Sequence, residues 1–133
     1  MNEVLISLGS NEDPEANISL CRSLLSDVFD FIVFSETSVT TPYGQHYKNN
    51  FLNQLALATT TLERCEIEKK LKTLEIKMGR LPTDKEMGVV KIDVDLIRWN
   101  DIIIKKDEWD RDYIAPLLSG LEKVIADSAR ENR

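Results

Sequence analysis

The order of strand-like and helix-like segments constrains the fold of this chain more than any other feature. Four runs rich in apolar and β-branched residues, at 4–8, 31–39, 51–60 and 92–99, have the composition of β-strands. A helical period follows the first run, and another follows the third. The periodic positions are Ile18, Cys21, Leu24, Leu25 and Val28 in the first stretch and Ile67, Leu71, Leu74 and Met78 in the second. The order is therefore strand, helix, strand, strand, helix, strand.

This order is that of the ferredoxin-like, or split βαβ, arrangement. Asn100 and Asp101 form a tight turn, residues 102–105 suit a short partner strand, and residues 117–126 can form a last helix before a polar, frayed tail. We therefore expect an α+β fold, a ferredoxin-like βαββαβ sandwich with an added hairpin and C-terminal helix. With 133 residues the chain can bury one core, so residues 1–133 are expected to form a single domain.

Composition limits the possible partners. The net charge of −6 argues against a nucleic-acid partner, whose binding surface would be basic. No stretch approaches the roughly 18 apolar residues of a membrane span, and the N-terminus lacks the regions of a signal peptide. Cys21 and Cys65 fall in the helical stretches and are expected to be buried thiols. We expect a cytoplasmic monomer with neither nucleic-acid nor membrane partners.

Asp93 and Asp95 carry the strongest chemical signal. Residues two apart on a strand share one face, so these carboxylates would stand about 7 Å apart. Ile92, Val94 and Leu96 would point to the opposite face. Mg²⁺ takes carboxylate oxygens as ligands and usually keeps waters and substrate phosphates in its shell. The pair therefore indicates phosphoryl transfer, or else a solvated strand face, since Asp-x-Asp is a common pattern.

Two long segments without a clear period, residues 40–50 and 80–91, are candidates for binding loops. Loops of this length in so small a domain are usually functional or mobile. Both lie on the side to which the two aspartates would point.

Five short motifs follow one another with fitting gaps across most of the chain up to residue 104. They are Gly9-Ser10-Asn11, Thr40-Thr41-Pro42-Tyr43-Gly44, Phe51-Leu52-Asn53, the segment from Glu75 to Arg80, and Asp93-Val94-Asp95-Leu96. In this order they resemble the 6-hydroxymethyl-7,8-dihydropterin pyrophosphokinase family, which moves pyrophosphate from ATP to a pterin alcohol in folate biosynthesis.

The resemblance implies a division of the site into two halves. In the catalytic half, Asp93 and Asp95 would hold two Mg²⁺ ions that bridge the phosphates of ATP, and Arg80 would act beside them. The residues implied for nucleotide binding are Glu75, Lys85, Lys91 and Arg111. In the pterin half, the implied residues are Thr40, Pro42, Tyr43, Phe51, Asn53 and Tyr113. Two aromatic rings and an amide that reads the polar edge suit a flat heterocycle.

The chain departs from the family pattern in the loop before the aspartates. Val90 stands where family members carry an arginine, and Pro82, Glu86 and Met87 stand where they usually have Arg, Arg and Trp. The basic residues that can compensate are Arg80, Lys85, Lys91, Lys105, Lys106 and Arg111. Two functions stay open: transfer of pyrophosphate from ATP to 6-hydroxymethyl-7,8-dihydropterin with release of AMP, or a catalytically weak or inactive module that binds a pterin or another partner.

Overall fold

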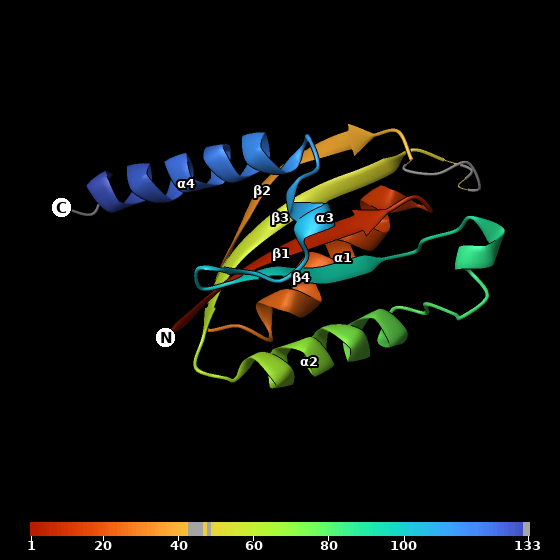
Figure 1. The fold of residues 1–133 in the computed structure, drawn as a ribbon, viewed down its shortest axis with the longest axis horizontal. Coiled ribbons are helices and arrows are strands. Elements are labelled where there is room, and N and C mark those ends of the chain that lie inside the picture. Colours follow the sequence, from red (N-terminus) through yellow and green to blue (C-terminus); the bar gives the residue numbers. More distant parts are fainter. Residues whose placement is uncertain (43–46, 48, 132–133) are drawn as a thin grey trace.

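One antiparallel sheet of five strands forms the centre of the fold (Figure 1). The computed structural model describes residues 1–42, 47 and 49–131, apart from the side chains of Lys85, Arg130 and Glu131. The strands are β1 (Asn2–Ser10), β2 (Phe31–Thr40), β3 (Phe51–Thr60), β4 (Asp93–Trp99) and β5 (Ile102–Ile103), in the spatial order β2-β3-β1-β4-β5. The first four strands have the ferredoxin-like order, and β5 adds the hairpin, which confirms the expected fold class.

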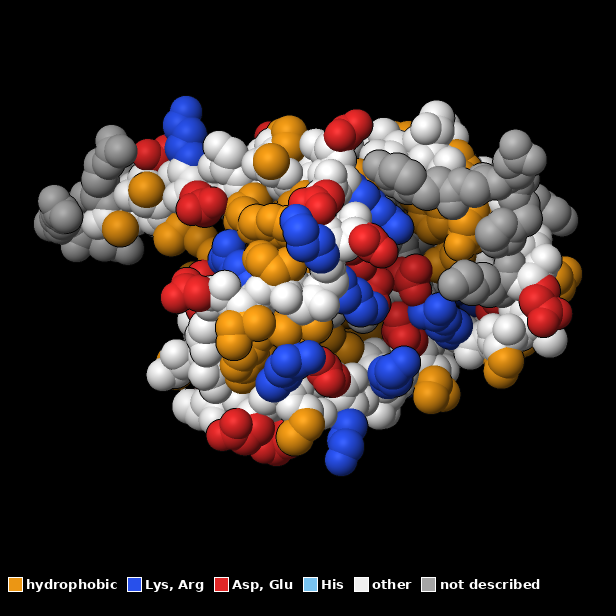
Figure 2. All heavy atoms as spheres, in the orientation of Figure 1, with side chains coloured by type: hydrophobic (Ala, Val, Ile, Leu, Met, Phe, Trp, Pro, Cys, Tyr) orange, Lys and Arg blue, Asp and Glu red, His pale blue; other side chains and the backbone are white. Residues whose placement is uncertain are grey.

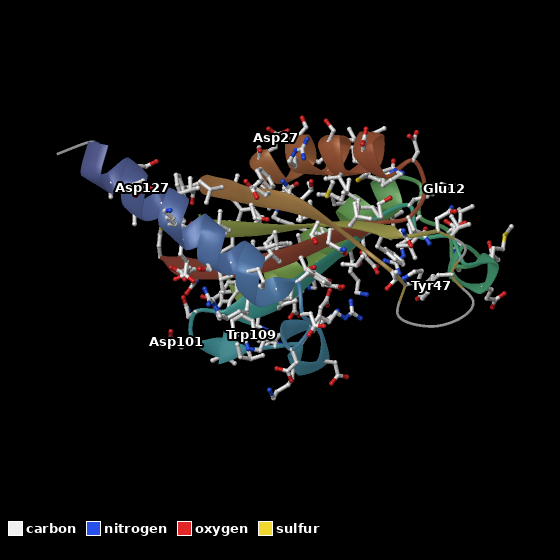
Figure 3. The ribbon with its side chains drawn as sticks, turned by 90° about the horizontal axis from the view of Figure 1, so that it is seen from above. Glu12, Asp27, Tyr47, Asp101, Trp109 and Asp127 are labelled. Atoms are coloured by element: carbon white, nitrogen blue, oxygen red, sulfur yellow. The ribbon has the colours of Figure 1, made fainter. Side chains whose placement is uncertain are left out.

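Helices cover both faces of the sheet. The main helices are α1 (Pro14–Ser26), α2 (Arg64–Lys77) and α4 (Ile114–Glu131). Helices α1 and α2 pack on one face and α4 on the other, and Figure 3 shows α1 and α4 on opposite sides. The short helix α3 (Lys106–Trp109) connects β5 to α4, and a 3-10 turn, η1 (Lys85–Met87), lies in the loop before β4. The last helix extends past the predicted residues 117–126, because its polar end contains good helix formers and no proline or glycine.

The face under α1 and α2 is apolar. Its buried residues include Val4, Ile6 and Leu8 of β1, Val94 and Leu96 of β4, and the stripes Ile18, Cys21 and Leu25 of α1 and Ile67, Leu71 and Leu74 of α2. Burial raises the pKa of the Cys21 thiol to about 12. Cys65 is exposed, so the expectation of a second buried thiol is wrong. It lies about 200° around the helix from Ile67, away from the apolar stripe.

The opposite face changes from apolar to polar along the strands. In its apolar half, Leu5, Leu55 and Ile97 pack against Ile114, Leu118 and Leu121. In its polar half, the register places Gly9 beside both Asn53 and Asp93, and Ser7 beside Asp95. Helix α4 therefore covers the apolar half, and the polar half is left for a site.

Substitution of a buried residue of α4 tests the packing of this helix on the sheet. Leu121 is 1% exposed within the core of the α4 face, whereas Val124, one turn further on, is 58% exposed. We expect Leu121→Ala to lower the free energy of unfolding by about 2–4 kcal/mol, because it leaves a cavity between helix and sheet. Val124→Ala should change it by less than about 0.5 kcal/mol. Urea unfolding followed by circular dichroism measures both, and equal losses would contradict packing through Leu121.

Candidate active site

A pocket lies at the polar end of the α4 face. Figure 2 shows a hollow near β4 in which acidic side chains gather beside basic ones. The pocket is lined by Ser7, Gly9, Thr40, Tyr47, Phe51, Asn53, Asp93, Glu108, Arg111 and Tyr113. Six of these lining residues were candidate site residues in the sequence analysis: Thr40, Phe51, Asn53, Asp93, Arg111 and Tyr113. Segments far apart in the chain thus meet because β1 pairs with both β3 and β4.

Gly9 keeps the floor of the pocket open. A Cβ atom at this position would lie 3.5 Å from Asn53 Oδ1 and 3.9 Å from Phe51 Cδ1, both ordinary contact distances. A side chain longer than one carbon would fill the space in front of the amide and the ring. The Asn53 amide is itself fixed, since its Nδ2 donates to Thr40 Oγ1 at 2.7 Å and to the Ser38 carbonyl at 3.3 Å.

Aromatic rings stand on two sides of this floor. Phe51, at the start of β3, meets Tyr47 edge-on, with ring centroids 5.2 Å apart and planes at 81°. Figure 3 shows Tyr47 at the same end of the sheet as Glu12, which follows β1. Tyr113 precedes α4, and burial raises the pKa of its phenol, while hydrogen bonds with Arg111 and Ser7 act in the opposite direction. The Tyr113 ring is itself part of the buried cluster between α4 and the sheet.

Arg80 joins Asp93 to a buried glutamate. Its Nη1 donates to Asp93 Oδ1 at 2.5 Å and to Glu75 Oε2 at 2.8 Å. The same Glu75 oxygen accepts the backbone N–H of Val94 at 2.8 Å. Burial raises the pKa of Glu75, although the Val94 bond and the Arg80 charge oppose this. Glu75 therefore anchors Arg80 and the start of β4, and it does not line the pocket.

Asp95 has two charged neighbours from the segment after β5. Lys105 Nζ donates to Asp95 Oδ1 at 2.6 Å. The carboxyl of Glu108, on α3, faces Asp95 and can hydrogen-bond to it when one of the two is protonated, and Arg111 Nη1 lies 3.9 Å from Glu108 Oε1. Burial, and then the charge of Asp95, raise the pKa of Glu108 to about 7. Trp109, labelled in Figure 3, packs against the core of the α4 face, and the Arg98 guanidinium lies 5.7 Å from the centre of its ring.

The two aspartates fit Mg²⁺ only in part. Their side chains share the polar face, while Ile92, Val94 and Leu96 are buried on the other, as the alternation predicts. Within the described part of the chain, no group of three or more His, Cys, Asp or Glu side chains could hold an ion. Two carboxylates still suit Mg²⁺, because its remaining ligands are usually water and substrate phosphates. The residues therefore fit an ion whose coordination the substrate completes.

The loop before β4 is held by the Gly-Ser-Asn segment. Asn11 Oδ1 accepts the Val90 N–H at 2.6 Å, Asn11 Nδ2 donates to the Gly88 carbonyl at 3.0 Å, and the Val90 carbonyl accepts the Asn11 N–H at 2.9 Å. The Val90 side chain points inward, since the residue is 4% exposed. An arginine here would have to bury its charge or shift the loop.

Several candidate residues lie elsewhere. Lys91 Nζ donates to the Gly79 carbonyl at 3.0 Å and lies 3.5 Å from Asp84, so its charge is used within the loop. Pro42, Arg80 and Asp95 are not among the residues that line the pocket, although Arg80 contacts Asp93, which does line it. Tyr43 and the side chain of Lys85 lie outside the described residues.

Three pocket residues were missed by sequence reasoning: Ser7, Tyr47 and Glu108. Ser7 lies two residues before Gly9 on the same strand and therefore on the same face, so strand alternation could have identified it. Glu108 had none, because a helix of four residues shows no period.

Comparisons with known proteins place this chain in a family. A family model described as 7,8-dihydro-6-hydroxymethylpterin-pyrophosphokinase (HPPK) matches residues 5–123. The chain belongs to this family, whose description names a pyrophosphokinase. It is also 32% identical over 87 residues to the "Folic acid synthesis protein FOL1" of Dictyostelium discoideum. That match covers 58% of this chain and 13% of the relative, so the chain spans a small part of the relative's length.

Two further findings are more limited. The solution structure of the C-terminal domain of the MgtC protein from Mycobacterium tuberculosis superposes with a TM-score of 0.41 at 12% identity, covering 72% of this chain and 87% of that one. Among the described residues, no helix combines the length and apolar character needed to cross a membrane.

The raised pKa of Glu108 predicts a pH-dependent stability. A carboxyl whose pKa rises from 4.5 to about 7 on folding binds its proton more tightly in the native state, so stability falls as pH rises between these values. We expect Glu108→Gln, which cannot ionise, to be more stable than the parent at about pH 8 by roughly 1–3 kcal/mol. The difference should shrink below about pH 4.5.

Urea unfolding across this pH range measures the effect. Asp107→Asn, on an exposed position of the same helix, is the matched control and should keep the parent's pH profile. If Glu108→Gln also kept that profile, Glu108 would not be the group responsible.

Proposed function

We propose that this chain transfers pyrophosphate from ATP to 6-hydroxymethyl-7,8-dihydropterin and releases AMP. One observation carries the proposal: a single pocket brings the aromatic and amide residues Phe51, Asn53 and Tyr113 together with Asp93. A slot for a flat heterocycle thus adjoins a carboxylate suited to phosphoryl transfer. Membership of the HPPK family supports the same pair of substrates.

In the pterin half, recognition would combine stacking with a polar edge. Phe51 and Tyr113 offer ring faces, and Asn53, fixed by Thr40, offers an amide beside the open floor at Gly9. A fused heterocycle gains from such stacking, and a fixed amide discriminates by hydrogen bonding. We propose Pro42 and Tyr43 as further parts of this half.

In the catalytic half, Asp93 and Asp95 would hold the Mg²⁺ ions. When bound, these ions would neutralise charge on the phosphates of ATP. Arg80, anchored by Glu75, and Arg111, at the pocket wall, would add positive charge that is already oriented. Lys85 and Lys91 are proposed as further nucleotide contacts, and Lys91 would first have to leave Asp84.

The reaction would be an in-line displacement. The hydroxymethyl oxygen of the pterin forms a bond to the β-phosphorus of ATP, the bond from that phosphorus to the oxygen bridging the α- and β-phosphates breaks, and AMP leaves with this oxygen. The hydroxyl proton passes to solvent. No covalent intermediate with the protein is needed, so most of the rate enhancement would come from positioning and from charge stabilisation. We propose that residues 1–133 do this as one domain, as a cytoplasmic monomer without nucleic-acid or membrane partners.

A second function, a pterin-binding or interaction module without efficient turnover, is favoured by the loop before β4. Val90 replaces an arginine, is buried, and leaves that charge out of the loop. Titrations with the pterin and with ATP in the presence of Mg²⁺ separate the two. Binding of both supports the enzyme, and binding of the pterin alone supports the module.

Removal of the Phe51 ring tests the pterin half. We expect Phe51→Ala to weaken pterin binding by about 1–3 kcal/mol, because a stacking face is lost. Phe31→Ala, an exposed phenylalanine at the start of β2, should leave the affinity unchanged. Calorimetric titration without nucleotide measures both variants, and parent-like affinity in Phe51→Ala would remove this residue from the site.

Neutralising an aspartate tests the catalytic half. We expect Asp95→Asn to stay folded and to lose AMP release by about 100-fold or more, since a ligand for the metal is lost. Asp101→Asn, in the exposed turn after β4, is the control and should release AMP as the parent does. AMP is quantified by chromatography at saturating ATP, pterin and Mg²⁺. A parent without detectable AMP under these conditions would favour the binding module.

A further inference from the structure

Both aspartates of the catalytic half already carry a cation from the protein itself. Arg80 contacts Asp93 at 2.5 Å, and Lys105 contacts Asp95 at 2.6 Å. A metal ion at these carboxylates would therefore meet two positive side chains, and at least one of them has to give way.

The two cations are held very differently. Arg80 is bound by two carboxylates, those of Asp93 and Glu75, and lies 3.5 Å from the Ile92 carbonyl. Its side chain is 32% exposed. Among the described residues, Lys105 forms its ion pair with Asp95, and its side chain is 49% exposed. Lys105 is therefore the cation that can leave.

The backbone of Lys105 stays in place while its amine can move. Its N–H donates to the Ile97 carbonyl at 3.4 Å, and its carbonyl accepts the Trp109 N–H at 2.9 Å. These bonds fix the Cα atom between β5 and α3. The four-carbon stem of lysine is flexible, so Nζ can turn from Asp95 towards a ligand over β4.

Negative charge is what keeps the amine on Asp95. Lys105 Nζ donates to Asp95 Oδ1 at 2.6 Å, and the carboxyl groups of Glu108 and Asp93 act on the same amine. A divalent cation at Asp95 would cancel this attraction and add repulsion. The phosphates that accompany the metal would then be the nearest negative groups.

We propose that Lys105 is the counter-ion of Asp95 in the metal-free protein and that its amine transfers to a phosphate of the nucleotide when metal and nucleotide bind. The proposal rests on the function proposed above. In this proposal Lys105 pairs first with Asp95 and then with a phosphate. Its amine would supply a positive charge near the phosphates, which the Val90 side chain does not.

Two binding measurements on Lys105→Met test the exchange, and neither depends on turnover. Mn²⁺ binding without nucleotide, followed by electron paramagnetic resonance, should be about fivefold tighter than in the parent, because a competing cation is gone. Binding of α,β-methylene-ATP at saturating Mg²⁺, followed by calorimetry, should be about fivefold weaker, because a phosphate contact is gone. A role in folding alone would not move the two affinities in opposite directions.

The neighbouring lysine provides a matched control. Lys106 pairs with Asp110 within α3, and its side chain is 74% exposed. Lys106→Met removes the same charge one residue away and should change neither affinity. Lys105→Arg keeps the charge and should keep the Mn²⁺ affinity near that of the parent.

The two affinities test the two roles of Lys105 separately. Unchanged Mn²⁺ affinity in Lys105→Met overturns the counter-ion role, and unchanged nucleotide affinity overturns the transfer. If the parent binds both Mn²⁺ and the nucleotide, and Lys105→Met binds them equally well, the proposal for Lys105 is wrong and the pyrophosphokinase function is unaffected. A parent that binds no nucleotide at saturating Mg²⁺ defeats the pyrophosphokinase function, and the transfer of Lys105 with it.

Discussion

The pairing of β1 with both β3 and β4 is the constraint on which the rest of the molecule depends. It aligns Asn53, Gly9 and Asp93 across three strands, and it places Ser7 beside Asp95. A shift by one residue would turn every one of these side chains to the opposite face. The buried residues under α1 and α2 hold the register, because the same shift would expose Val4, Ile6 and Leu8. The core thus sets the geometry of the pocket.

A dense group of charges is tolerated beside the pocket because each acidic side chain has a partner. Glu75 and Asp93 share Arg80, and Asp95 contacts Lys105 and Glu108. Carboxylates without such partners would repel one another and lose solvation. The same compensation keeps the pocket ready for a ligand that brings both positive and negative charge, as a metal–nucleotide complex does. In the proposed reaction, the metal ion takes over from Lys105 the neutralisation of the Asp95 charge.

Much of the pocket could be predicted from short motifs, and its charge network could not. The strands, to within about two residues at each end, and the shared face of Asp93 and Asp95 follow from local patterns. The six candidate residues that line the pocket were indicated by the motifs that the chain shares with the family. The exposed Cys65, the buried Val90 and the contact of Glu108 with Asp95 do not. Each of these depends on what packs against the residue, and α3 is too short to show a period.

The sequence by itself determined the order and type of the strands and of the three main helices, the alternation that separates Asp93 and Asp95 from the core, and the motifs of the family. These are local properties, since the period of a helix or strand is set by neighbouring residues. Only the tertiary structure decided that α4 stops short of the polar half of the sheet, that Glu75 reaches Arg80, and that Lys105 lies on Asp95. The reason is that strand register and helix packing join residues that no local pattern connects.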